Sequence, residues 1–251
     1  MNSLTGLRFR YAVVSIIIVI FALTVLPVYA AQKFEIINTD QLKAMFDKKQ
    51  KFVLIDARSK QEYKNAHIIK AINIPDKKLQ ENMSLLPIDK NALLVIYCNG
   101  VKCGKSLRLA KQLEPLGYQN IKIYSEGIPV WEERNMPIFV GPDYEKKVDT
   151  SKLKPADIQK MIQEKKTDYV LVDVRDPSEY KEGHIPTSIN IPAETFASRS
   201  DILPKEKKII VTCNTGSRSY LAYRKLIQLA YPNIYQTLIA DWKDAGMVLE
   251  K

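Results

Sequence analysis

The stretch Val53-Leu-Ile-Asp-Ala-Arg58 decides the fold, because it returns further along the chain as Val170-Leu-Val-Asp-Val-Arg175. Three more pairs share the same offset of 117 residues: Glu62-Tyr63 with Glu179-Tyr180, His67-Ile68 with His184-Ile185, and Asn73-Ile-Pro75 with Asn190-Ile-Pro192. Internal repetition of this kind indicates one structural unit used twice. The chain is therefore predicted to contain two domains of one fold.

The offset shrinks towards the end of each repeat. Later matches are Cys98 with Cys213 at 115, Ser106 with Ser219 at 113, and Trp131 with Trp242 at 111. Two of the extra residues in the first repeat therefore lie in the loop after its cysteine.

Each repeat has about the length of one ordinary compact domain. We place the first domain at residues 34–140 and the second at 152–251. Residues 141–151 between them contain Gly, Pro and charged side chains, a composition typical of a linker.

Short apolar runs alternate with amphipathic segments inside each repeat. Strands are expected at 52–55, 71–74, 93–97, 121–124, 169–172 and 209–212, and helices at 40–46, 106–113 and 219–229. Apolar runs separated by helical patterns are typical of parallel strands buried on both faces. The predicted fold class is α/β, with two tandem domains that each hold a small parallel sheet flanked by helices.

The first thirty residues have the order of a secretory signal. Arg8 and Arg10 precede an apolar run from Tyr11 to Val25, and the segment ends in Val28-Tyr-Ala30, a V-x-A order that fits a peptidase site. This pattern predicts a signal peptide cleaved after Ala30; an uncleaved membrane anchor is the alternative, because the run is almost long enough to span a bilayer. Either reading predicts an exported protein, periplasmic or extracellular, that contacts the membrane only if residues 1–30 remain attached.

The chain is basic, with a formal net charge of +10. Removal of residues 1–30 would leave +8, because they hold two arginines and no acidic residue. Such a surface attracts small anions. The lysines are dispersed and no stripe interleaves them with aromatic residues, so no nucleic-acid partner is predicted.

The loop Cys213-Asn-Thr-Gly-Ser-Arg-Ser219 follows a predicted strand and leads directly into a helix. Backbone N–H groups of a small-residue loop can converge on an anion, and the start of the helix adds positive potential there. Both effects favour a thiolate at Cys213, and Arg218 offers a planar cation for an oxyanion. The predicted anion-binding residues of the loop are Asn214, Thr215, Gly216, Ser217, Arg218 and Ser219.

The Cys-x-x-Gly-x-Arg-Ser loop resembles that of the rhodanese domain, as do Asp-Val-Arg, Glu-Tyr, Gly-His-Ile and Asn-Ile-Pro before it. The resemblance covers nearly all of residues 34–251. It implies a sulfurtransferase in which Cys213, and also Cys98, takes sulfur from an anionic donor as a persulfide and passes it to cyanide, a thiol or a protein sulfur acceptor. Sulfur is both nucleophile and cargo, so no metal or organic cofactor is expected.

The first loop departs from this pattern. Cys98-Asn-Gly-Val-Lys-Cys-Gly-Lys-Ser106 is two residues longer and contains no arginine, so Lys102 or Lys105 would have to hold the anion. Cys103 could resolve a persulfide on Cys98 or form a disulfide with it in an oxidising compartment. An unpaired thiol at Cys103 is the alternative, because three cysteines cannot all pair.

The second repeat departs at a different place. The glycine-rich turn that the resemblance places beside the cysteine pocket is kept as Glu126-Gly127 in the first repeat. In the second repeat Leu238-Ile-Ala-Asp241 takes its position. This loss puts the substrate pocket of the second domain in question.

Several other residues that carry chemistry elsewhere are interpreted as structural. His67 and His184 occupy equivalent positions, and each repeat offers too few ligands for zinc. The Asp-Arg pairs of the repeated strand are expected to form charged hydrogen-bond networks, and Trp131 and Trp242 are expected in the core.

Two other functions compete with sulfur transfer. A cysteine-dependent phosphatase or arsenate reductase also places a cysteine in an anion-binding loop, but phosphatase loops have five residues between Cys and Arg, whereas Cys213 and Arg218 are separated by four. A non-catalytic binding module would not need a cysteine in both loops. Activity on a phenyl phosphate, lost in Cys213→Ser, would favour the phosphatase.

Overall fold

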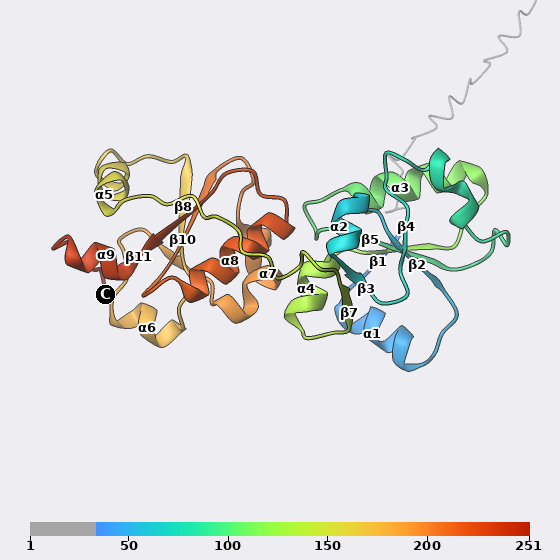
Figure 1. Ribbon diagram of the computed structural model, residues 1–251, viewed down its shortest axis with the longest axis horizontal. Helices are drawn as coiled ribbons and strands as arrows, with labels where there is room; N and C mark the ends of the chain where they lie inside the picture. Colours follow the sequence, from blue (N-terminus) through green and yellow to red (C-terminus); the bar gives the residue numbers. More distant parts are fainter. Residues whose placement is uncertain (1–33) are drawn as a thin grey trace, which may run out of the picture. The chain divides into compact units, whose positions relative to one another are not determined.

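Two separate parallel sheets, one in each repeat, form the frame of residues 34–251, the part of the chain that the computed structural model describes (Figure 1). The signal or anchor predicted at residues 1–30 lies outside the described residues. Within residues 34–251, no helix combines the length and apolar character needed to cross a membrane.

The first repeat has a five-stranded sheet in the order β1-β6-β5-β2-β4 and a two-stranded antiparallel sheet of β3 and β7. All pairs in the larger sheet are parallel. The elements in chain order are β1 (Glu35–Ile37), α1 (Thr39–Asp47), β2 (Val53–Asp56), α2 (Lys60–Asn65), β3 (Ala66–Ile68), β4 (Ile72–Asn73), η1 (Gln80–Leu85), β5 (Leu94–Tyr97), α3 (Lys105–Leu113), η2 (Glu114–Leu116), β6 (Ile121–Tyr124), α4 (Gly127–Glu133) and β7 (Ile138–Val140).

The second repeat has a four-stranded parallel sheet in the order β11-β10-β8-β9. Its elements are α5 (Pro155–Gln163), β8 (Tyr169–Asp173), α6 (Pro177–Glu182), β9 (Ile189–Asn190), η3 (Ala193–Thr195), α7 (Phe196–Arg199), η4 (Ser200–Ile202), β10 (Lys208–Cys213), α8 (Ser217–Gln228), β11 (Ile234–Leu238) and α9 (Ile239–Asp244). The α/β class and the parallel sheets predicted from the sequence are confirmed.

The two repeats share more pairing than their strand counts suggest. The pairing of β1 with β6 shrinks in the second repeat to a single parallel bridge between Lys152 and Gln236. The pairing of β3 with β7 shrinks to a single antiparallel bridge between His184 and Glu250. The two repeats therefore share one topology, and the second repeat has single bridges where the first repeat has paired strands.

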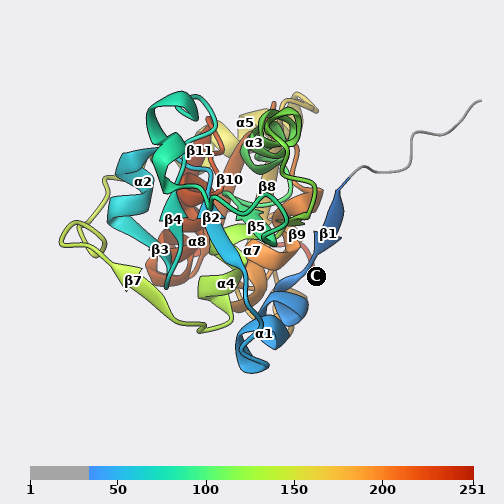
Figure 2. The same cartoon turned by 90° about the vertical axis from the view of Figure 1, so that its right-hand side faces the viewer.

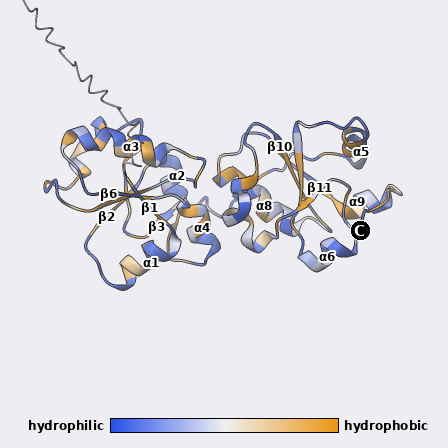
Figure 3. Cartoon of the chain, turned by 180° about the vertical axis from the view of Figure 1, so that it is seen from behind, coloured by the Kyte–Doolittle hydropathy of each residue, from blue (hydrophilic) through white to orange (hydrophobic). Residues whose placement is uncertain are grey.

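Helices cover both faces of each sheet because the strands are apolar on both sides. In the first repeat, Leu109 of α3 packs with Ile55 and Ile96, whereas Leu42 of α1 packs with the alternate residues Leu54 and Val95. Figures 1 and 2 show α1 and α3 on opposite sides of the strands. Figure 3 shows mixed colours on α5, as expected of a helix with one buried face.

The second repeat is layered in the same way. Leu226 of α8 packs with Val172 and Val211, and the other face of the sheet is covered by α5 and α9 through Ile158 and Trp242. Each repeat therefore has a core on both sides of its sheet. In both, the cysteine lies where a central strand ends and leads into a covering helix.

Short side-chain motifs start the helices around the site. Ser59 and Glu62 form a reciprocal capping box at α2, and Asp176 and Glu179 form the same box at α6. Such boxes satisfy two backbone N–H groups that a helix start leaves unpaired. The box also places a glutamate at the same point of each repeat, beside the cysteine loop.

Candidate active site

Cys213 ends β10, and its sulfur lies under the loop that opens α8. The backbone N–H groups of Gly216 and Ser219 donate to Cys213 Sγ at 3.2 and 3.3 Å. The hydroxyl of Ser219 lies 3.2 Å from the same sulfur. Gly216 has a φ of 110°, which a residue with a Cβ rarely adopts. The predicted convergence of loop amides is thus present, and it is centred on the sulfur itself.

Gln236 of β11 holds this loop in place. Its Nε2 donates to Ser219 Oγ at 2.7 Å and to the carbonyl oxygen of Gly216 at 3.1 Å, and its Oε1 accepts from Thr150 Oγ1 at 2.9 Å. Reasoning from the sequence missed Gln236, because it is 23 residues from the cysteine and belongs to no repeated motif. The parallel register of β10 and β11 brings it there.

Arg218 is bound to a carboxylate rather than turned towards the sulfur. Its two terminal nitrogens donate to Glu179, with one contact at 2.8 Å, and one of them also lies 3.4 Å from Asp176. The hydrogen bond from Arg218 is the main reason that the pKa of Glu179 falls to about 2. Asn214 Nδ2 donates to the same carboxylate at 3.1 Å. The role of Arg218 in binding a substrate anion stays a prediction.

The remaining predicted loop residues divide by exposure. Thr215 and Ser217 are exposed, whereas Cys213 is only 2% exposed. A hollow of about 430 Å³ beside the loop is lined in part by Thr215, Gly216 and Leu238. An anion in this hollow would meet the loop backbone before it met the sulfur.

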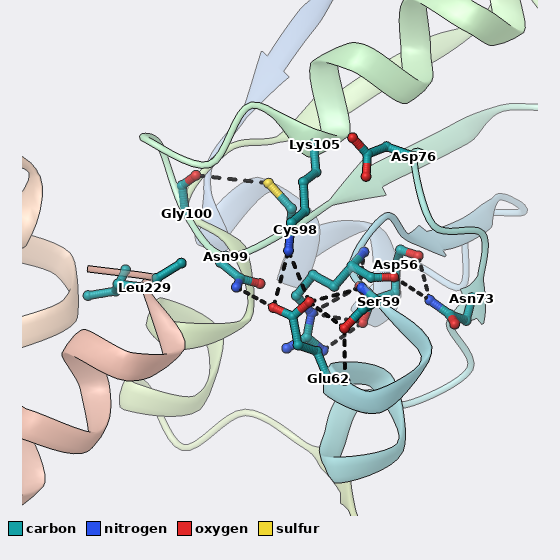
Figure 4. A network of polar contacts seen from close by, with 12 residues as sticks. Asp56, Ser59, Glu62, Asn73, Asp76, Cys98, Asn99, Gly100, Lys105 and Leu229 are labelled. Atoms are coloured by element: carbon teal, nitrogen blue, oxygen red, sulfur yellow. Dashed lines mark hydrogen bonds and ion pairs between the residues drawn. The ribbon is translucent and has the colours of Figure 1, made fainter. Parts of the chain in front are cut away.

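The first loop holds Cys98 in the equivalent place, just after β5. Cys98 is also 2% exposed, and its sulfur lies 3.5 Å from Ser106 Oγ and 4.0 Å from the carbonyl oxygen of Gly100 (Figure 4). Both Cys98 and Cys103 are free cysteines in this structure. The disulfide considered between them is not formed here, and the role of Cys103 stays a prediction.

Glu62 is the counterpart of Glu179 and lies at the centre of the network in Figure 4. Lys105 Nζ lies 2.9 Å from one carboxylate oxygen, and Asn99 Nδ2 donates to the other at 2.6 Å. Burial alone would raise the pKa of Glu62, but hydrogen bonds from Ser59, Asn99 and Lys105 lower it to about 2. Lys102 Nζ donates to the carbonyl oxygen of Leu203 at 2.6 Å. Both lysines proposed as anion holders therefore have other partners, and that role stays a prediction.

The turn after β6 touches the cysteine loop. A Cβ on Gly127 would lie 2.3 Å from the carbonyl oxygen of Cys98 and 2.5 Å from the amide nitrogen of Gly100. Its φ is +67°, so only glycine fits without strain. The second repeat has Leu238 here in an extended conformation, and its side chain lies near Gly216. The turn borders the cysteine loop in both repeats, as expected.

The residues interpreted as structural have structural contacts. His67 and His184 each stack on a tyrosine, and each Nδ1 is hydrogen-bonded to the carbonyl oxygen of that tyrosine. Asp56 is fully buried and pairs with Arg58 at 2.6 Å, and Asp173 pairs with Arg175 at 2.7 Å in the same way. The predicted charged networks are confirmed.

The structure thus brings together most residues of each predicted loop and adds three that were not predicted as site residues. These are Glu62, Glu179 and Gln236. The glutamates had a usable signal, since each repeats at the same offset and stands three residues after a helix-capping side chain. Gln236 had no such signal.

Comparison with known proteins gives one family. A family model described as the rhodanese-like domain matches residues 38–134 and 154–244. These matches fall inside the two predicted domains, whose outer bounds stay predictions.

Several relatives of this chain are named as sulfurtransferases. A sulfurtransferase of Allochromatium vinosum is 34% identical over 67 residues, covering 27% of this chain and 63% of that protein. A thiosulfate:glutathione sulfurtransferase of Saccharomyces cerevisiae is 30% identical over 105 residues, covering 36% of this chain and 76% of that protein. The chain thus spans less than two thirds of the A. vinosum protein. A crystal structure of a thiosulfate sulfurtransferase from Pseudomonas aeruginosa aligns at 21% identity and a TM-score of 0.38, over 86% of this chain and 43% of that one.

Proposed function

Because this chain belongs to the rhodanese-like family, we propose that it is a sulfurtransferase that carries sulfane sulfur as a cysteine persulfide. Thiosulfate, a polysulfide or another persulfide is the donor, and a thiol, a protein thiol or cyanide is the acceptor. The observation that carries this proposal is the pair of backbone N–H groups that point at Cys213 Sγ.

The proposed chemistry follows from these two backbone N–H groups. A thiolate is the reactive form of cysteine, and the N–H groups of Gly216 and Ser219 are placed to donate hydrogen bonds to the sulfur while it reacts. The thiolate of Cys213 attacks the sulfane sulfur of the donor, and the S–S bond of thiosulfate breaks as sulfite leaves with its electron pair. The product is a persulfide, and the loop amides remain placed to hold its negative charge.

The second half of the reaction returns the enzyme to its starting state. An acceptor thiolate attacks the outer sulfur of the persulfide, and the bond to Cys213 breaks with the electrons returning to Cys213 Sγ. This two-step exchange needs no net oxidant or reductant. The persulfide is the covalent intermediate that divides the transfer into two displacements.

Mass spectrometry of the intact protein tests this proposal directly. After incubation with thiosulfate or polysulfide, we expect the protein to gain one sulfur atom that maps to Cys213, and we expect Cys213→Ser to lose that gain. Wild-type protein that acquires no sulfur from any donor, and transfers none to cyanide, would contradict the proposal. A non-catalytic binding module would then be the better reading.

We also propose that the protein acts outside the cytoplasm, on the basis of the charge and apolar pattern of residues 1–30. Sequencing the N-terminus of protein purified from its natural cells tests this. A new N-terminus directly after Ala30 is expected, and an intact Met1 in a membrane fraction would indicate an anchor instead.

A further inference from the structure

We propose that a groove on the first repeat binds an extended, acidic segment of the protein that receives sulfur from this chain. The inference rests on the proposed function, because it names the acceptor as a protein with an acidic segment rather than a small thiol or cyanide. The groove has a volume of about 1010 Å³ and is lined by residues of α2, β4, the segment after β4, η1 and the start of α3.

The size and the walls of the groove favour a chain segment over a small anion. Its volume is at the upper end of the range that drug-sized ligands occupy, so thiosulfate would fill only a small part of it. Ile72, Pro75 and Leu85 line it, and Leu85 is 48% exposed. Apolar walls do not stabilise an inorganic anion, whereas they can bury apolar side chains of a peptide.

The edge strand β4 gives the groove a backbone wall. Both residues of β4, Ile72 and Asn73, line the groove, and β4 is the last strand in the sheet order. No strand within residues 34–251 pairs with the outer side of β4. Such edges offer backbone N–H and C=O groups to an extended peptide. The bound segment is therefore expected to be extended rather than helical.

The charge of the groove sets the charge of its partner. Six cations line it but only two carboxylates, and the cations are Lys60, Lys64, Lys77, Lys78, Lys105 and Arg108. The last three of these form salt bridges with acidic side chains. Lys60, Lys64 and Lys77 are exposed, and within residues 34–251 their side chains form no salt bridge or hydrogen bond. Three ammonium groups are thus available to carboxylates of a partner.

The second repeat shows that the fold does not require these charges. At the offset of 117, the counterparts of Lys60, Lys77 and Lys78 are Pro177, Glu194 and Thr195. The second repeat nevertheless forms the equivalent helix α6 and the equivalent strand β9. The extra lysines of the first repeat are therefore not needed to build these elements, which favours a role in binding.

The groove reaches the first cysteine loop. Lys105 lines the groove and also opens α3 directly after that loop, and its Nζ lies 2.9 Å from a carboxylate oxygen of Glu62. Figure 4 shows Asp76, another lining residue, on the side of Lys105 that faces away from Gly100. A segment bound in the groove therefore lies beside the loop that holds Cys98, where a cysteine of the partner can approach a persulfide.

Peptide binding by the full chain tests the groove. The probe is a fluorescein-labelled peptide of Glu and Leu residues that ends in Ser, and the control probe has Lys in place of Glu. The acidic peptide should bind with an affinity that falls as salt rises, because salt screens the charge pairs, and the basic peptide should not bind. Fluorescence anisotropy measures both. Loss of acidic-peptide binding in excess thiosulfate at constant ionic strength would indicate a small-anion site and overturn the inference.

Charge reversal locates the binding site. K64E/K77E should weaken binding of the acidic peptide at least about tenfold, because like charges then face it. K51E/K181E is the matched control: it changes the net charge equally at exposed positions that do not line the groove, and Lys181 is the counterpart of Lys64. It should weaken binding by less than about twofold.

Two outcomes of this comparison would contradict the proposed groove. Equal weakening by the two pairs would show attraction to the net charge of the chain, and unchanged binding in K64E/K77E would place the peptide elsewhere. All four substitutions are at exposed side chains, so thermal unfolding should be nearly the same in both variants.

Sulfur transfer tests whether the bound segment belongs to the acceptor. The probes now end in Cys, whose thiolate attacks the outer sulfur of the persulfide while the electrons of the broken S–S bond return to the cysteine of the enzyme. After loading with thiosulfate, the wild-type protein should transfer sulfur faster to the acidic peptide than to the basic one. K64E/K77E should lose this preference and keep its rate of transfer to cyanide.

The failure of this inference can be told apart from the failure of the proposed function. Equal transfer to both peptides by the wild-type protein would overturn the assignment of the segment to a sulfur acceptor. If the wild-type protein transfers sulfur neither to cyanide nor to a peptide, the proposed function fails, and the anisotropy measurements still decide whether the groove binds an acidic segment.

Discussion

The two cysteine loops occupy the same place in the fold, yet the hydrogen bonds to their sulfurs differ. In each, a cysteine ends or follows a central strand, a glutamate from a capping box holds the loop asparagine, and a cation binds that glutamate. In the second loop the backbone N–H groups of Gly216 and Ser219 donate to Cys213, whereas in the first loop Cys98 Sγ lies against the hydroxyl of Ser106 and the carbonyl oxygen of Gly100. The same position in the fold therefore gives the two sulfurs different hydrogen-bond partners.

The supports beneath the loops differ as well. Gln236 binds Ser219 in the second repeat, and the strand pairing gives Ile123 as its counterpart in the first. Gly127 allows the first loop to approach the turn after β6, where the second repeat has Leu238. Each repeat thus supports its cysteine loop with one residue that the other repeat lacks: Gln236 in the second and Gly127 in the first.

Removal of the strand-end cysteines should give the largest effect and test whether the loops differ in function. Cys213→Ala should lower sulfur transfer to cyanide at least about a hundredfold, because the nucleophile is lost. Cys98→Ala should lower it less. Steady-state transfer from thiosulfate measures both.

A loss of sulfur transfer in Cys98→Ala alone would contradict this assignment of the two loops. The first repeat would then be the principal site, and the amides around Cys213 would be structural. Equal losses in both variants would instead indicate that the repeats act in one sequence.

The buried ion pairs offer a second comparison. Asp173→Asn should lower the free energy of unfolding by about 3 to 5 kcal/mol, because it leaves Arg175 buried without a counter-charge. Asp56→Asn should lower the free energy of unfolding by about 1 kcal/mol more than Asp173→Asn does, since the buried Tyr97 hydroxyl also donates to Asp56 at 2.8 Å. Urea unfolding measures both.

Asp168→Asn is the matched control for these two variants. Asp168 pairs with Lys208 on an exposed edge, where solvent screens the interaction, so little change is expected. A similar loss in all three variants would show that burial is not what makes the Asp-Arg pairs important.

The turn glycine should give the smallest effect. Gly127→Ala should destabilise the protein by about 1 to 3 kcal/mol through its positive φ, and its Cβ should displace the Cys98 loop. Gly246→Ala is a matched control, because Gly246 has a φ of +70° but nothing within 4 Å of an added Cβ. Thermal unfolding and alkylation of Cys103 measure the two consequences.

Sulfur uptake at Cys213 should be unchanged in Gly127→Ala. Equal effects of the two glycine variants on the first loop would show that backbone strain, and not contact with Cys98, accounts for the loss.

Much of this molecule was readable from the sequence because the information was local or repeated. The Asp-Arg motif, the apolar runs and the constant offset of 117 predicted two α/β domains with parallel sheets. The position of each cysteine at a strand end followed from the same pattern. The Asp-Arg networks were also predicted correctly, since the partners are two residues apart.

The tertiary structure alone decided what surrounds each sulfur. Arg218 reads as an anion holder from its spacing, but a residue 39 positions earlier binds it instead. Gln236 reaches the second loop only through strand register. Patterns of a few residues determine elements and their order, whereas hydrogen-bond partners depend on which distant side chains the packed sheets bring within reach.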